Sequence, residues 1–81
     1  MSEKLVFQIR PLSLEEGFEL VSDRMLRDPL RRERLYEAVV AAVSLGLGLD
    51  AEIQIFDTAG SIAEVLPLPT PVTTHVQNVI P

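Results

Sequence analysis

Five arginines between positions 24 and 34 form the densest group of side chains that could bind an anion. A guanidinium group donates paired hydrogen bonds to phosphate or carboxylate oxygens, so several arginines together can hold an anionic ligand or an acidic partner. Most of these arginines recur at intervals of three or four, as residues on one side of a helix do. The group comprises Arg24, Arg27, Arg31, Arg32 and Arg34.

An ordinary solvated surface accounts for the same arginines. Asp23 stands four positions from Arg27, and Asp28 stands four from Arg32, so each pair could form an exposed ion pair worth about 0.3 kcal/mol. Arg31 and Arg32 resist that interpretation, because they would lie in the first turn of a helix, where the macrodipole mildly disfavours cations. A solvated surface and an anion or acidic-partner site therefore both remain open, with the solvated surface preferred.

The other side chains that could bind a metal ion or take part in catalysis stand without the further residues that such a site needs. His75 is the single histidine, and a metal site needs several converging ligands. Thr73 and Thr74 precede it, but nucleophilic catalysis also requires an oriented base. Asp57 and Glu64 are explained by a turn and by an outward strand position. The sequence therefore predicts neither an enzyme nor a resident cofactor or metal.

Charge is distributed unevenly along the 81 residues, whose net charge is −5. All seven basic residues lie in the first 34 positions, and no base follows. Nucleic-acid-binding proteins usually carry a basic surface, so nucleic acid is not the expected partner. The N-terminal residues lack the basic and apolar regions of a signal peptide. We expect a small acidic cytoplasmic protein that does not span a membrane.

Residues 35–49, LYEAVVAAVSLGLGL, are the most apolar stretch and contain one charge, Glu37. A membrane-spanning helix needs ~20 apolar residues, so a buried helix of a soluble domain is predicted instead. A helix that is apolar on most sides must pack against more than one surface. Its larger side chains are predicted to face the core at spacings of three and four. They are Tyr36, Val39, Val40, Val43 and Leu47.

Two further elements are predicted before this stretch. Residues 4–10 alternate as a half-buried strand does, with Leu5, Phe7 and Ile9 facing inward. Ser13 and Glu16 form a capping-box pattern that predicts a helix over residues 14–27. The Asp28-Pro29 pair breaks that helix and starts a second one, over residues 29–45.

A β-hairpin is predicted after the apolar stretch, with strands over residues 51–57 and 61–66. Asp57 and Gly60 fit the first and last positions of a type I turn. This turn predicts that Phe56 pairs with Ile62 and that Ile53 pairs with Val65. The outer face of the sheet is then polar with an apolar island, which we expect to mediate self-association. The predicted self-association residues are Val6, Phe56, Ile62 and Leu66.

These elements predict an α+β domain over residues 1–66 in the order β-α-α-β-β. A small, mostly antiparallel three-stranded sheet would carry both helices on one face, and its first two strands would be antiparallel. A single helical crossover would instead make those strands parallel. Residues 67–81 are predicted to form a Pro-rich extended segment, either mobile or added to the sheet as an edge strand.

The excess of aliphatic residues in so small a chain predicts a protein–protein interaction or assembly module that acts as a homodimer. The alternative is a small regulator that binds an anionic ligand or nucleic acid through the arginines between positions 24 and 34. The sequence identifies no particular partner, ligand or pathway.

Overall fold

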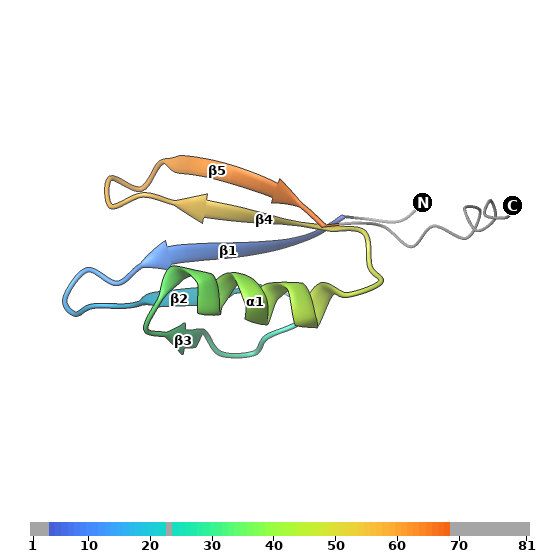
Figure 1. Cartoon of the computed structure of the whole chain (residues 1–81), viewed down its shortest axis with the longest axis horizontal. Coiled ribbons are helices and arrows are strands. Elements are labelled where there is room, and N and C mark those ends of the chain that lie inside the picture. The colour runs from blue at the N-terminus through green and yellow to red at the C-terminus, as the bar shows by residue number, and fades with distance from the viewer. Residues whose placement is uncertain (1–3, 23, 69–81) are drawn as a thin grey trace, which may run out of the picture.

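A computed structural model describes residues 4–22 and 24–68 of the chain. One helix lies against one face of a five-stranded mixed sheet whose strand order is β3-β2-β1-β4-β5 (Figure 1). The predicted arrangement of three strands and two helices is therefore wrong. The elements are β1 (Leu5–Pro11), β2 (Phe18–Val21), β3 (Leu30–Arg32), α1 (Leu35–Gly46), β4 (Ala51–Phe56) and β5 (Ile62–Pro67).

The core lies between α1 and the central strands, because alternate strand residues point toward the helix. Phe7, Ile9, Leu20 and Ile53 are the largest side chains that are fully buried there. Leu5, Phe7 and Ile9 face inward as the alternation in the sequence predicts. The helix packs on β1 to β4 and has no contact with β5. The described residues therefore cover the sheet on one face only, and only in part.

The predicted helix over residues 14–27 is wrong. Residues 13–17 belong to a loop in which the Leu12 N–H donates to the Gly17 carbonyl at 3.0 Å. Strand β2 then pairs antiparallel with β1, which sets Leu20 opposite Ile9. Leu14, the first residue of the predicted helix, is 96% exposed. Pairing with a neighbouring strand thus outweighs the local helical pattern, as tertiary contacts often do.

The second predicted helix exists but begins six residues later than expected, at Leu35 rather than Pro29. Leu30–Arg32 pairs with β2 as a short strand instead. The backbone N–H of Arg34 donates to the Glu37 carboxylate at 3.0 Å, which satisfies one donor at the start of the helix. The predicted break at Pro29 falls in the connection between β2 and β3.

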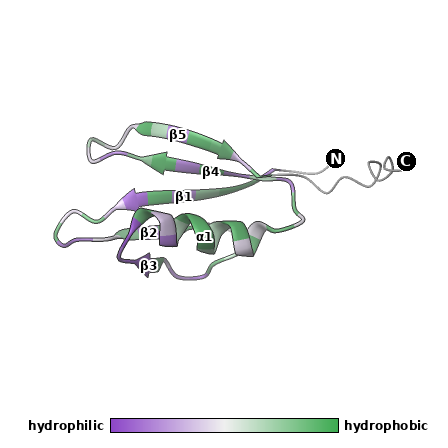
Figure 2. Ribbon diagram, in the orientation of Figure 1, coloured by the Kyte–Doolittle hydropathy of each residue, from purple (hydrophilic) through white to green (hydrophobic). Residues whose placement is uncertain are grey.

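The helix turns its small residues toward the sheet, which reverses the predicted orientation. Its buried residues are Ala38, Ala42 and Gly46, which recur every four positions. Small side chains let the helix approach the strands closely: a Cβ added at Gly46 would lie 2.9 Å from the Phe7 ring. Of the five larger side chains that we expected inside, Val39 is partly buried against the core, whereas the other four are exposed: Tyr36, Val40, Val43 and Leu47. The ribbon of α1 is hydrophobic along much of its length (Figure 2).

Strands β1 and β4 are parallel, which corrects the prediction that they are antiparallel. The reason is that a single helix makes the crossover between β3 and β4, and it returns the chain in the direction of β1. Because the first predicted helix does not form, the chain passes through one helix rather than two between β1 and β4, and the two strands become parallel.

The hairpin of β4 and β5 and its turn are confirmed. The Asp57 N–H donates to the Ser61 carbonyl at 2.9 Å, and Gly60 has a φ of 87°. Phe56 pairs with Ile62 as predicted, but a β-bulge follows, so that Ile53 pairs with Leu66 rather than with Val65. The extra residue moves Val65 to the outer face of the sheet. The predicted segment 67–81 lies outside the described residues after Leu68.

Candidate interaction surface

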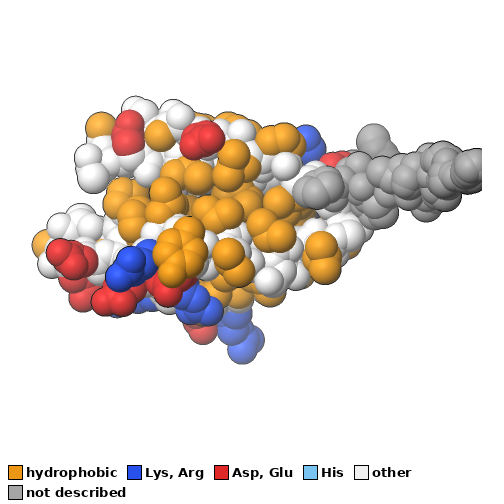
Figure 3. Space-filling model, viewed as in Figure 1, with side chains coloured by type: hydrophobic (Ala, Val, Ile, Leu, Met, Phe, Trp, Pro, Cys, Tyr) orange, Lys and Arg blue, Asp and Glu red, His pale blue; other side chains and the backbone are white. Residues whose placement is uncertain are grey.

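A broad apolar face covers the exposed side of α1 and continues toward β5. Figure 3 shows hydrophobic side chains gathered over the helix and in the space between the helix and β5. Tyr36, Val40 and Leu47 are exposed to 62%, 58% and 77%, and Leu66 of β5 is partly exposed. We call this surface the apolar face. It comprises Leu35, Tyr36, Val40, Val43, Leu47 and Leu66.

Within the described residues this face is uncovered, because one helix lies against a sheet of five strands. The helix packs over β1 to β4, so no described element forms a second layer above the helix-side surface of β5. Apart from the half-buried Leu66, every residue of β5 is exposed. An exposed apolar patch of this kind on a small protein marks a site where another surface packs.

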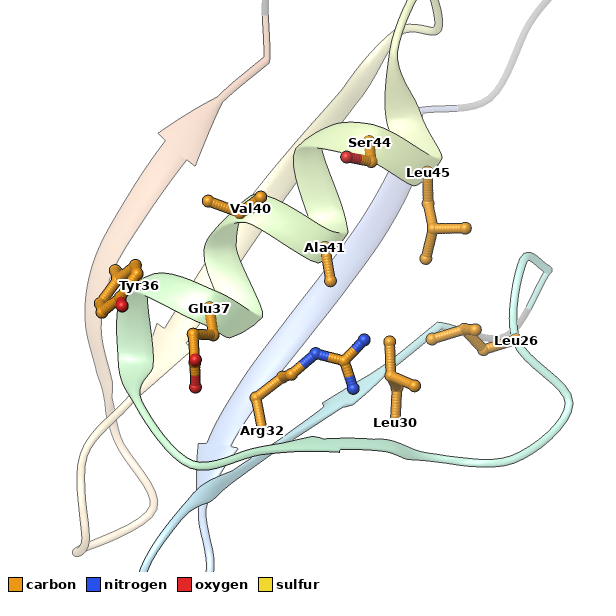
Figure 4. A pocket seen from close by; sticks show the side chains of 9 residues that line it. All are labelled: Leu26, Leu30, Arg32, Tyr36, Glu37, Val40, Ala41, Ser44 and Leu45. Carbon is orange, nitrogen blue, oxygen red and sulfur yellow. The ribbon is translucent and has the colours of Figure 1, made fainter.

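A groove of about 520 Å³ follows one flank of α1, between the helix and β3. Figure 4 shows Arg32 extending from β3 toward the helix, with Glu37 at the same end of the groove. The remaining lining is mainly apolar, so the groove could accept an apolar side chain of a partner. Its lining is Leu26, Leu30, Arg32, Tyr36, Glu37, Val40, Ala41, Ser44 and Leu45.

The predicted arginine group is not one cluster. Arg31 and Arg32 are adjacent residues of a strand, so they point to opposite faces of the sheet. The Arg24 guanidinium donates to the Lys4 carbonyl at 3.3 Å. Arg27 is an exposed residue of the connection before β3, and Arg34 directly precedes α1.

Carboxylates accompany the two arginines of β3. The Arg31 guanidinium pairs with the Glu15 carboxylate at 3.0 Å. A hollow beside Arg31 and Arg32 is also lined by Glu15, Glu16 and Glu33. These negative charges compete with any anionic ligand, so the geometry favours a solvated charged surface over an anion site.

The predicted self-association residues lie on both faces of the sheet. Val6, Phe56 and Ile62 lie on the outer face, whereas Leu66 faces the helix side with Ile53. The Arg10 guanidinium lies over the Phe56 ring, 5.5 Å from its centroid.

Polar contacts divide the apolar island on the outer face. Gln8 and Gln54 lie between Val6 and Phe56, and the Gln8 side-chain amide donates to the Gln54 oxygen at 3.2 Å. The outer face is therefore a mixed surface with hydrogen-bonded glutamines at its centre.

The exposed ridge of α1, which Tyr36, Val40, Val43 and Leu47 form, was missed by the sequence analysis. Those residues were assigned to the core because they are the larger side chains of the helix. The signal that could have found the true orientation is the spacing of Ala38, Ala42 and Gly46, whose small size suits a helix that lies close to a sheet.

The described residues hold no group of three or more His, Asp or Glu side chains that could bind a metal ion. Asp57 serves the hairpin turn, because its Oδ1 accepts from the backbone N–H groups of Ala59 and Ser61 at 2.9 and 3.0 Å. Thr73, Thr74 and His75 lie outside the part of the chain that the structure describes.

In the described part of the chain, no helix has the length and apolar character needed to cross a membrane. Searches of protein-family models, curated proteins and solved structures found no match to this chain.

Proposed function

We propose that this chain is a protein-interaction module that acts by assembling, in the first instance as a homodimer. The observation that supports the proposal is the apolar face, which one helix on a five-stranded sheet leaves uncovered. Within this face, Tyr36, Val40 and Leu47 each expose more than half of their surface. In a monomer these side chains stay in contact with water, and a second chain placed beside them reduces that contact.

The location that we propose is the cytoplasm. The chain contains no cysteine, so its fold needs no disulfide and is unaffected by a reducing compartment. Localisation of a tagged full-length chain by fluorescence microscopy tests this part of the proposal.

Sedimentation velocity of the full chain, from low to high micromolar concentration, tests the self-association. The expected result is a monomer–dimer equilibrium that shifts toward the dimer as concentration rises. Raising the salt concentration should weaken the dimer little, because apolar and backbone contacts are not screened as surface charges are. A monomer at high micromolar concentration, or a dimer that dissociates in salt, would contradict the proposal.

A further inference from the structure

The two edges of the sheet differ in how well they are protected against pairing with another strand. Strand β3 is short, follows Pro29 and carries Arg31 and Arg32, and short, charged or proline-flanked edges resist pairing. Strand β5 is twice as long, has one charged residue, Glu64, and reaches a proline only at its last position, Pro67. Among the described strands, none pairs with the outer edge of β5, so this is the edge that can accept a further strand.

The direction of the backbone groups in β5 determines how such a strand could pair. The Leu68 N–H donates to the Ala51 carbonyl at 2.9 Å, and hydrogen-bonded pairs alternate along an antiparallel ladder. Leu66 and Glu64 then direct their backbone groups toward β4. Val65 lies between them, so its N–H and carbonyl point away from β4, toward the free edge.

We propose that a second copy of this chain adds its own β5 at this edge, antiparallel, with Val65 opposite the second copy's Val65. This inference rests on the proposed self-association and defines its geometry. In this register the two Val65 residues exchange two N–H···O=C bonds, and each Glu64 lies opposite a Leu66.

The neighbouring registers are less favourable. A shift toward the turn places Glu64 opposite Glu64, and like charges directly opposite each other destabilise a sheet. In the Val65 register Pro67 lies opposite Ala63 and accepts one bond but donates none. A shift in the other direction places Pro67 opposite Val65 instead, so the central pair then also loses one of its two bonds. Charge and proline placement in β5 thus favour the Val65 pairing.

The arrangement makes one ten-stranded sheet from the two five-stranded ones. Its two-fold axis is perpendicular to the sheet, so both α1 helices lie on the same side. The two apolar faces then border one shared groove, whose floor is β4 and β5 of each copy.

Single cysteines in the full-length chain test the register, because the natural chain contains none. The Cα atoms of the paired Val65 residues would lie about 5.5 Å apart, within the range that a disulfide spans. The control is Ala63→Cys, since Ala63 is also exposed but would lie roughly 14 Å from its copy. Under mild oxidation, Val65→Cys should form a covalent dimer much faster than Ala63→Cys does.

Val65→Pro tests the hydrogen bonds themselves. It removes an N–H that points away from β4, so the hairpin should remain intact while the edge loses its donor. We expect a monomer in sedimentation velocity and an unchanged circular dichroism spectrum. Leu14→Asp, in the exposed loop before β2, should leave the dimer intact.

The outcomes separate edge pairing from self-association itself. The natural chain could be a dimer in which Val65→Cys cross-links no faster than Ala63→Cys. In that case edge pairing is wrong, and the homodimer forms through another surface. A folded Val65→Pro that remains a dimer, or a monomeric Leu14→Asp, also overturns edge pairing. A natural chain that is monomeric throughout overturns both proposals.

Discussion

Ile53 and Leu66 are direct neighbours across the ladder of β4 and β5, and both lie on the face of the sheet that α1 partly covers. Ile53 is fully buried beneath the helix, whereas Leu66 lies beyond the helix and is half-buried. Leu66 therefore links the core to the apolar face. Any substitution there acts on both stability and association.

Leu66→Ala should lower the free energy of unfolding by about 1–2 kcal/mol, below the usual cost at a fully buried leucine because half of the side chain already contacts water. Val65→Ala should cost roughly 0.5 kcal/mol, because Val65 lies on the outer face beside Gln54. Urea denaturation at one low protein concentration measures both values without a contribution from the dimer. Equal costs for the two variants would contradict the bulged register.

Ala42→Leu should destabilise the chain by about 1–3 kcal/mol, because Ala42 is fully buried between α1 and the sheet and a larger side chain overpacks that contact. Ala41→Leu is the matched control. Ala41 lines the groove beside α1, which has room for the added atoms. Thermal unfolding followed by circular dichroism should show a lower midpoint for Ala42→Leu alone. A similar loss in both variants would mean that the helix is oriented differently.

The parts of the fold that the sequence predicts correctly are those whose signals are local. Strand β1 shows a clear alternation of apolar and polar residues, and α1 lies within a long apolar stretch. The hairpin has a turn that Asp57 and Gly60 define. Each of these segments forms the expected element because its own pattern and its place in the core agree.

Strands β2 and β3 could not be found in the same way. Each is too short to show a period of two, and Ser13 with Glu16 supplied a false helix start. What makes Phe18–Val21 a strand is the adjacent edge of β1, which pairs with it over four residues. That information is non-local, and no pattern within the segment contains it.

The residues predicted for self-association do not share one face of the sheet. A single bulge decides which face Leu66 and Val65 occupy. A one-residue slip moves every later side chain to the other face. The predicted arginine cluster does not form for a related reason. Arg31 and Arg32 are adjacent residues of a strand and point to opposite faces, whereas a helix would have placed them nearer to each other.

Asp57→Ala should lower the free energy of unfolding by about 1–2 kcal/mol, because two backbone N–H groups of the turn lose their acceptor. Asp57→Asn retains an oxygen at that position and should cost less than half as much. Thr58→Ala changes an exposed neighbour in the same turn and should have little effect. Urea denaturation of the three variants measures these differences, and an equal effect of alanine at both positions would exclude the side-chain acceptor as the cause.

Gly17→Ala should destabilise the chain by about 2–3 kcal/mol, because two costs add at this position. Gly17 has a φ of 122°, which side chains other than glycine rarely adopt, and an added Cβ would lie 3.0 Å from the Arg32 carbonyl oxygen. Gly48→Ala separates these costs. Gly48 has a φ of 81° but no atom within 4 Å of an added Cβ, so its loss should be about 1 kcal/mol.

Hydrogen exchange locates the difference between the two glycine variants. The Gly17 contact joins the start of β2 to the end of β3, since Phe18 pairs with Arg32. Gly17→Ala should therefore speed exchange in residues 18–32 more than in β4 and β5, which are held by their own hairpin. Gly48→Ala should leave residues 18–32 unaffected. Faster exchange across the whole sheet in Gly17→Ala alone would show instead that β2 and β3 unfold together with the core, so that the contact at Gly17 supports the entire domain.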